Sequence, residues 1–251
     1  MKNLYRFLLV LFFATGSVAH ADVLTVAVAA NAEYVFNDLA AEFKKESGHE
    51  VKPIINSSGK FVTQIMNGAP YDVFLSADME FPEKLYKDGY AVASPKAYAY
   101  GALVVWTMKD LELSNWQKAL TNAVVNKIAV ANPQTAPYGR ETMKALSAAK
   151  LDQILAPKLV FGESIAQTNQ YIFSAAADVG FTAKSVVLSP ELKGKGKWVD
   201  VPKDWYQPIA QGAVILKHGQ DTNPKLAQEF FTFLYSDKAR AILERYGYLL
   251  P

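Results

Sequence analysis

The hydrophobic and polar positions follow one plan that recurs four times along the chain. Each unit has a short apolar run, a small polar loop, and a segment with apolar residues every three or four positions. A short apolar run rich in β-branched residues is typical of a strand, and a 3.6-residue period is typical of a helix. Strands that alternate with helices predict an α/β protein whose sheets are mostly parallel and flanked by helices.

The first unit is the clearest of the four. Its strand covers residues 24–30, Asn31 follows, and a helix is expected over residues 32–46, with Val35, Leu39 and Phe43 on one face. Ser47-Gly48 is typical of a helix end. The other units contain the loops NSSGK (56–60), NPQTAPYG (132–139) and ESIAQ (163–167), and their helices are expected to begin at residues 61, 140 and 168.

Each loop brings a helix N-terminus to the carboxyl end of a strand. About four N–H groups there have no partner within the helix, and the helix dipole is positive, so these loops favour an anion without any charged side chain. Asn31 is either an N-cap, worth about 1 kcal/mol, or an amide donor to a ligand. Ser57 and Ser58 have the same alternatives. Tyr138 either packs under its loop or contacts the ligand.

An enzyme remains as an alternative because residues 57–60 match S-x-x-K, the nucleophile motif of penicillin-recognising enzymes. Those enzymes also need S-D-N and K-T-G later in the chain. The nearest match to S-D-N is Ser236-Asp237-Lys238, and no K-T-G occurs. A serine acyl-enzyme is therefore much less favoured than a binding protein.

The N-terminal segment has the pattern of a cleavable signal peptide, residues 1–21. Lys2 and Arg6 precede an apolar core at residues 7–14, and Ala19-His20-Ala21 fits an A-x-A cleavage site. The apolar core is shorter than the roughly 20 residues that cross a membrane. We expect an exported, soluble protein of the periplasm.

Charge and composition exclude several kinds of site. The predicted signal peptide contains two of the 26 basic residues and none of the 24 acidic ones, so the mature chain is formally neutral and no nucleic-acid partner is expected. The chain has no Cys, which excludes disulfides, thiolate metal sites and N-terminal lipidation. His49 and His218 lack metal-site spacing, so we expect both to be solvated and no metal to be bound directly by side chains.

Five runs carry a resemblance to a known family: VAVAANAEYVFNDLAAEFKKESG, NSSGKFVTQIMNGAPYDVFLSAD, ANPQTAPYGRETMKAL, GESIAQT and FFTFLYSDKARAILERYGYLLP. In this order they resemble the bacterial periplasmic molybdate-binding proteins, the receptors of molybdate ABC importers. The resemblance implies a type II periplasmic-binding fold of two lobes, with lobe I at 22–102 plus 209–251 and lobe II at 103–208. It also implies a monomer without a cofactor or catalytic activity, which delivers molybdate or tungstate to an ABC permease.

The resemblance assigns the ligand to four positions. Asn31 stands where many members have Ser, Ser58 lies in the next loop, Tyr138 precedes Gly in P-x-G, and Ile165 would donate its backbone N–H. Some members use a Tyr after a later G-I-V strand, whereas this chain has Gly-Phe-Thr-Ala at 180–183. We expect the Tyr138 hydroxyl to replace it.

Ligand chemistry agrees with sites made of donors. Molybdate, tungstate and sulfate only accept hydrogen bonds at neutral pH, whereas phosphate is partly protonated and is best recognised by a site with a carboxylate. The nearest acids, Glu33, Glu141 and Glu163, are expected to point outward. A receptor for sulfate or another tetrahedral oxyanion remains the alternative within binding proteins.

Overall fold

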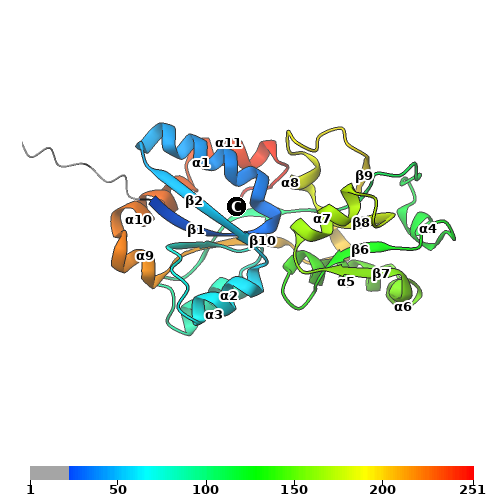
Figure 1. Ribbon diagram of the computed structural model, residues 1–251, viewed down its shortest axis with the longest axis horizontal. Helices are drawn as coiled ribbons and strands as arrows, with labels where there is room; N and C mark the ends of the chain where they lie inside the picture. The colour runs from blue at the N-terminus through cyan, green and yellow to red at the C-terminus, as the bar shows by residue number, and fades with distance from the viewer. Residues whose placement is uncertain (1–22) are drawn as a thin grey trace, which may run out of the picture.

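The structure, a computed structural model, describes residues 23–251 and consists of two lobes side by side, each built on a five-stranded sheet (Figure 1). The predicted signal peptide, residues 1–21, lies outside the described residues. Within residues 23–251, no helix has both the length and the apolar character that a membrane span requires.

Lobe I has the strand order β2-β1-β3-β10-β4. These strands are β1 (Val23–Ala29), β2 (Glu50–Asn56), β3 (Val73–Leu75), β4 (Lys96–Gly101) and β10 (Ile209–Ile215). Its helices are α1 (Glu33–Ser47), α2 (Ser58–Met66), α3 (Glu80–Lys87), α9 (Lys217–Thr222), α10 (Pro224–Phe233) and α11 (Asp237–Arg245). A short 3-10 helix, η1 (Ala30–Ala32), follows β1.

Helices cover both faces of this sheet. On one face α1, α10 and α11 enclose a core in which Phe43 meets Phe230 edge-on, with ring centroids 5.2 Å apart. On the other face α2 and α3 cover Phe74, which packs against Phe61. Figure 1 shows α1 and α11 above the sheet and α2 and α3 below it. Burial of such side chains contributes roughly 1.5–3 kcal/mol each.

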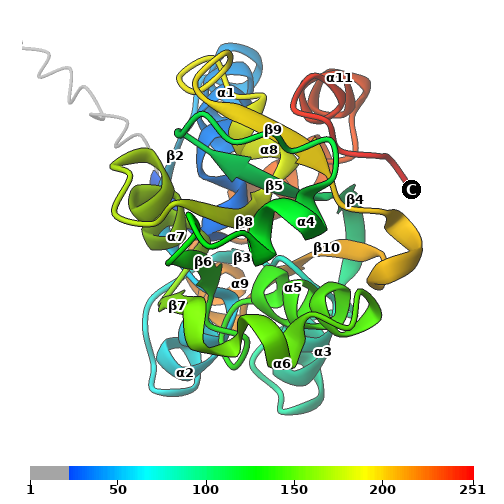
Figure 2. The same ribbon diagram turned by 90° about the vertical axis from the view of Figure 1, so that its right-hand side faces the viewer.

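Lobe II has the strand order β7-β6-β8-β5-β9. These strands are β5 (Leu103–Thr107), β6 (Ile128–Ala131), β7 (Leu159–Gly162), β8 (Val179–Ala183) and β9 (Lys197–Asp200). Its helices are α4 (Trp116–Thr121), α5 (Pro137–Ala148), α6 (Asp152–Leu155), α7 (Ile165–Phe173) and α8 (Lys184–Val187), with 3-10 turns at Ala156–Lys158 and Lys203–Trp205. Figure 2 faces this lobe, with α5 and α6 on one side of the sheet and α7 on the other.

The α/β class and the two-lobed architecture are therefore confirmed, but the sheets are less parallel than expected. In lobe I, β1 pairs in parallel with β2 and β3, whereas β10 is antiparallel to β3 and β4. In lobe II, β6 is parallel to β7 and β8, whereas β5 is antiparallel to β8 and β9. The antiparallel pairs involve the strands next to the crossings, where the chain enters and leaves lobe II.

The chain crosses between the lobes twice, at Ala102 between β4 and β5, and at the segment before β10. The exact boundaries at residues 102 and 208 stay a prediction. Polar contacts also join the lobes away from these crossings, and three of them follow. The Gly59 N–H donates to the Thr135 carbonyl at 2.9 Å, Lys60 pairs with Glu163, and Arg140 pairs with Asp78. The lobes are closed on each other.

Three helices begin earlier than their sequence pattern predicts. Helix α1 ends at Ser47, one residue after the predicted end, and the predicted stop at Gly48 is confirmed by its left-handed conformation with φ of 77°. However, α2, α5 and α7 begin at residues 58, 137 and 165, three positions before the predicted starts. Proline is favoured in the first turn of a helix, which suits Pro137. The polar loops are thus the first turns of helices.

Candidate functional site

All four predicted ligand positions line one cavity between the lobes. Lobe I contributes Ala29, Ala30, Asn31, Ser57, Ser58 and Ala77, and lobe II contributes Ala136, Pro137, Tyr138 and Ile165. Asn31, Ser58, Tyr138 and Ile165 are each at most 4% exposed. The cavity volume is about 10 Å³, room for about one water-sized sphere, so the lining residues nearly meet.

Three helices direct their N-termini to this cavity. Ser58 is the first residue of α2, Tyr138 the second of α5, and Ile165 the first of α7. The first N–H groups of a helix have no acceptor within it, and the dipole places partial positive charge at the same end. Helix ends from both lobes therefore form an environment that suits an anion.

The lining contains no Asp, Glu, Lys, Arg or His among the residues that the structure describes. An anion here would be held by backbone N–H groups and hydroxyls rather than by an ion pair, because the Asn31 amide, the only one in the lining, already donates to Gln211 and Tyr248. A carboxylate that could accept a hydrogen bond from a protonated ligand is also absent from that lining. The arrangement suits an oxyanion that carries no proton.

Asn31 is not an N-cap, so that interpretation is wrong. It lies inside η1, and the residue that precedes α1 is Ala32, without a side-chain cap. Its amide nitrogen donates to Gln211 Oε1 at 2.7 Å and to the Tyr248 hydroxyl at 3.0 Å. Its backbone carbonyl accepts a hydrogen bond from the Ser185 hydroxyl of lobe II at 2.8 Å. Its Oδ1 is buried without a partner within residues 23–251.

Ser58 keeps a donor available. Its hydroxyl oxygen accepts the Ala77 N–H at 3.0 Å, and its own proton has no recorded acceptor among the described residues. Ser57 precedes α2 but makes no capping hydrogen bond, and its buried hydroxyl has no partner in the described chain. Lys60 pairs with Glu163 instead of Ser57. The contact between nucleophile and base that an acyl-enzyme needs is not formed.

Tyr138 is 1% exposed, and its hydroxyl has no hydrogen-bond partner within the described chain. The hydroxyl lies at the first crossing: a methyl group added at Gly101 would be only 2.0 Å from it. Burial, followed by the nearby Tyr248, raises the pKa of Tyr138 well above its ordinary value. The side chain is therefore a neutral hydroxyl that can still donate a proton to an acceptor.

One expectation for the acids is wrong. Glu141 is only 8% exposed, because its carboxylate accepts the Gln207 N–H at 2.8 Å and pairs with Lys144 at 2.9 Å. It stabilises the segment that returns to lobe I instead of facing solvent. Glu33 is partly buried; burial and then the charge of Glu191 raise its pKa. Glu163 is exposed.

The sequence predicted that His218 is solvated, but the structure shows it in contact with a buried carboxylate. Its Nδ1 lies 2.8 Å from Oδ1 of Asp72, a carboxylate that is 2% exposed and also accepts the Thr25 N–H at 2.6 Å. This cluster ties the start of α9 to the sheet of lobe I. Residues 23–251 contain no group of three or more side chains that could hold a metal ion.

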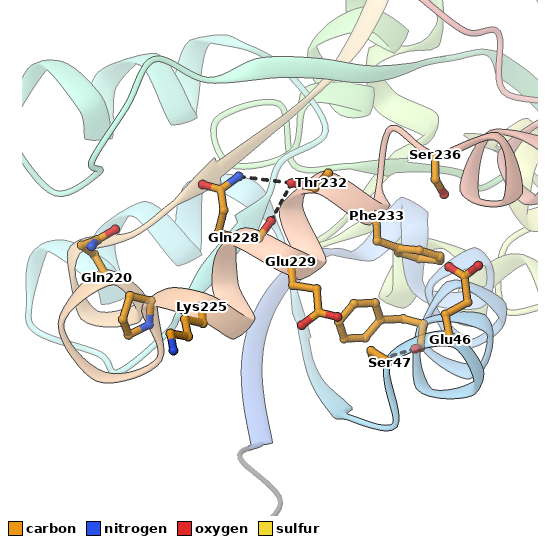
Figure 3. Close-up of a pocket in the computed structure, with 11 residues that line it drawn as sticks. Glu46, Ser47, Gln220, Lys225, Gln228, Glu229, Thr232, Phe233 and Ser236 are labelled. Atoms are coloured by element: carbon orange, nitrogen blue, oxygen red, sulfur yellow. Dashed lines mark hydrogen bonds between the residues drawn. The ribbon is translucent and has the colours of Figure 1, made fainter.

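A larger hollow lies elsewhere, on the outer side of lobe I between α1 and α10 (Figure 3). It has a volume of about 760 Å³, and Phe43 and Phe233 lie among polar side chains such as Glu46, Lys225 and Glu229. Within residues 23–251, no residue that lines this hollow has a buried side-chain nitrogen or oxygen without a hydrogen-bond partner. The small cavity, which has three such atoms, is the better candidate for a specific site.

Sequence reasoning found the four loops but missed Gln211, Tyr248 and Ser185. These residues contact Asn31 from positions 180, 217 and 154 residues away along the chain. The run RYGYLLP contributed to the resemblance and includes Tyr248, so only that residue had a signal in the sequence.

Comparison with known proteins identifies the family. The model of the bacterial extracellular solute-binding proteins matches residues 24–249. The molybdate-binding protein ModA of Azotobacter vinelandii is 41% identical over 92% of this chain and 91% of its own, and ModA of Rhodobacter capsulatus is 38% identical over 92% and 90%. The solved periplasmic molybdate-binding protein of A. vinelandii has a TM-score of 0.86 at 37% identity, covering 91% of this chain and 99% of that one. The chain belongs to the family of bacterial extracellular solute-binding proteins.

Proposed function

We propose that the protein is a solute receptor that binds molybdate in the cavity between its lobes. The observation that carries this proposal is the convergence of three helix N-termini and buried neutral donors on one cavity without a charged lining side chain. The names of the relatives that are 38–41% identical support the same ligand. Asn31, Ser58, Tyr138 and Ile165 are the proposed contacts, and the metal is reached only through its oxygens. Asn31 would contribute through its backbone, because its amide already donates to Gln211 and Tyr248.

Tungstate has the same charge and shape as molybdate and should bind to the same donors. Sulfate is also an acceptor-only dianion, so discrimination against it would depend on cavity size. Phosphate should bind more weakly because its proton would find no carboxylate in the lining. Neutral donors also avoid burying an unpaired charge when the site has no ligand.

We further propose that the receptor works in the periplasm, as a monomer, and delivers its ligand to the membrane permease of an ABC importer. Closure of the lobes around the ligand would mark the loaded receptor, and hinge motion would open the cavity for exchange. No cofactor is proposed beyond the transported oxyanion itself.

Binding without catalysis is part of the proposal. The separation of Lys60 from Ser57 by its ion pair with Glu163 supports this part. Incubation with penicillin-type or ester probes should give no covalent adduct in intact-mass spectra. An adduct at Ser57 would favour the acyl-enzyme instead.

Titration calorimetry of the ligand-free protein tests the ligand directly. Molybdate and tungstate should each bind with one-to-one stoichiometry, and sulfate and phosphate far more weakly. Sulfate binding as tight as molybdate binding would make the protein a general receptor for tetrahedral oxyanions. Failure of all four anions to bind would refute the proposed function.

A further inference from the structure

Gln211 lies at the point where a crossing strand meets the ligand site. It belongs to β10, is completely buried, and sits where the pairing of β10 with β4 shifts register, between Gln211 and Gly212. Such irregularities in a ladder redirect a side chain. The side chain of Gln211 reaches Asn31, which lines the cavity, although Gln211 itself does not.

The hydrogen bonds determine which way the Gln211 amide points. Its nitrogen donates to the Ile209 carbonyl at 2.8 Å and lies 3.4 Å from the Ala77 carbonyl. A carbonyl cannot donate, so the amide oxygen must face the other way, towards Asn31. Backbone acceptors thus set the orientation of Gln211.

Gln211 in turn sets the orientation of Asn31. Because Gln211 presents an acceptor, the Asn31 amide must present its nitrogen, which Tyr248 also accepts. The Tyr248 hydroxyl is 3.3 Å from the Asn31 carbonyl, which the Ser185 hydroxyl contacts as well. Gln211 and Tyr248 belong to lobe I, as Asn31 does, so they can hold the Asn31 side chain whether the lobes are open or closed, whereas the Ser185 bond requires the closed lobes.

We infer that Gln211 is a positioning residue for ligand binding: it fixes the loop of Asn31 at the hinge and so sets affinity without touching the ligand. This inference rests on the proposed function. A loop that is held in its binding geometry beforehand loses less conformational entropy when the ligand binds. Loss of the Gln211 contacts should therefore weaken binding even though every ligand contact remains in the chain.

The substitution Gln211→Glu tests the inference through the pH dependence of molybdate affinity. As a carboxylate, Glu cannot donate to the Ile209 carbonyl. Protonated Glu has one donor and one acceptor, so it can reproduce the bonds with the Ile209 carbonyl and the Asn31 amide, but not the longer one to the Ala77 carbonyl. Burial favours the protonated form of a carboxyl group. Among the described residues, Tyr248 is hydrogen-bonded to Asn31, and burial raises its pKa, as it does for the nearby Tyr138 and Tyr98, so these hydroxyls stay neutral between pH 5.5 and 8. Asp78, which follows Ala77 and pairs with Arg140, also has a pKa raised by burial; because it is present in variant and wild type alike, each affinity is compared with the wild type at the same pH.

At pH 8, Gln211→Glu should bind molybdate at least about tenfold more weakly than the wild type, about 1.4 kcal/mol. At pH 5.5 the difference should shrink to within about threefold, and the thermal midpoint of the unliganded variant should move towards the wild-type value in the same way. Gln228→Glu is the matched control, because Gln228 is exposed on α10; its affinity should equal that of the wild type at both pH values.

Wild-type affinity of Gln211→Glu at pH 8, or a loss of the same size at both pH values, would overturn the inference. If that variant fails to fold at pH 8, Tyr248→Phe decides, because it removes the other acceptor of the Asn31 amide. It should weaken binding several-fold, and unchanged affinity would overturn the inference. If the wild type does not bind molybdate, the proposed function fails; the unliganded midpoints of Gln211→Glu then still test whether Gln211 orients Asn31.

Discussion

Removal of the Tyr138 hydroxyl should have opposite effects on stability and on ligand affinity. Tyr138→Phe keeps the buried ring and deletes one oxygen that has no hydrogen-bond partner in the described chain. A buried polar group without a partner costs about 1–3 kcal/mol. The unliganded variant should therefore be as stable as the wild type or more stable, by up to about that amount.

Affinity should change the other way if the hydroxyl donates to the ligand. A hydrogen bond to a charged group contributes about 1.5–3 kcal/mol, so its loss should weaken molybdate binding roughly 10- to 150-fold. Urea unfolding without ligand measures the first effect, and calorimetry measures the second. Thermal unfolding with excess molybdate adds a check, because ligand stabilisation follows mass action.

Tyr98→Phe is the control, since Tyr98 in β4 is 2% exposed and its hydroxyl also lacks a partner in the part of the chain described. It does not line the cavity. It should match Tyr138→Phe in stability and the wild type in affinity. If Tyr138→Phe binds molybdate within twofold of the wild type, the hydroxyl does not reach the ligand and only the backbone of Tyr138 contributes.

Three further changes test other parts of the structure. Asn31→Asp should weaken molybdate binding at least about tenfold, because a carboxylate both opposes Gln211 Oε1 and repels a dianion; calorimetry that finds wild-type affinity would exclude Asn31 from the site. Glu33→Gln should raise the free energy of unfolding at pH 7 but not below pH 4.5, as urea titrations can measure. Burial and then the charge of Glu191 raise the pKa of Glu33 in the folded state, so the wild type loses stability as the pH rises from 4.5 through this raised pKa, whereas the variant does not. Arg140→Gln removes an ion pair with Asp78 that joins the lobes, so molybdate binding should weaken roughly tenfold and depend less on salt. If the affinity of the variant changes between 20 and 500 mM NaCl as much as that of the wild type, this reasoning is contradicted.

The sequence was enough to predict the repeated strand–loop–helix plan and the loops that meet in the cavity, because both follow from local periodicity and from the position of loops at strand ends. Helix starts were less predictable. The first turns of α2, α5 and α7 contain Ser, Gly, Pro and Gln, which are common in loops, and packing of the lobes holds them in helical geometry.

The partners of Asn31 could not be predicted from local patterns. Gln211 is the third residue of β10, where nothing in the sequence marks it as a contact of the first loop. Its role depends on a register shift that only the folded sheet defines. Glu141 was misjudged for a similar reason. Its helix position predicts exposure, but the chain returning to lobe I passes over it and provides the Gln207 N–H.

The sheet of lobe I cannot be completed until the chain is nearly finished. Strand β10 lies between β3 and β4, yet it follows them by more than 100 residues of sequence that build lobe II. Until residue 215 is available, β3 and β4 have no strand between them, whereas every strand of lobe II lies within residues 103–200. Pairing of distant segments is slow because their loop must close first. During synthesis or refolding, lobe II should therefore gain protection from hydrogen exchange first, and a chain that stops before β10 should expose the edges of β3 and β4 to aggregation.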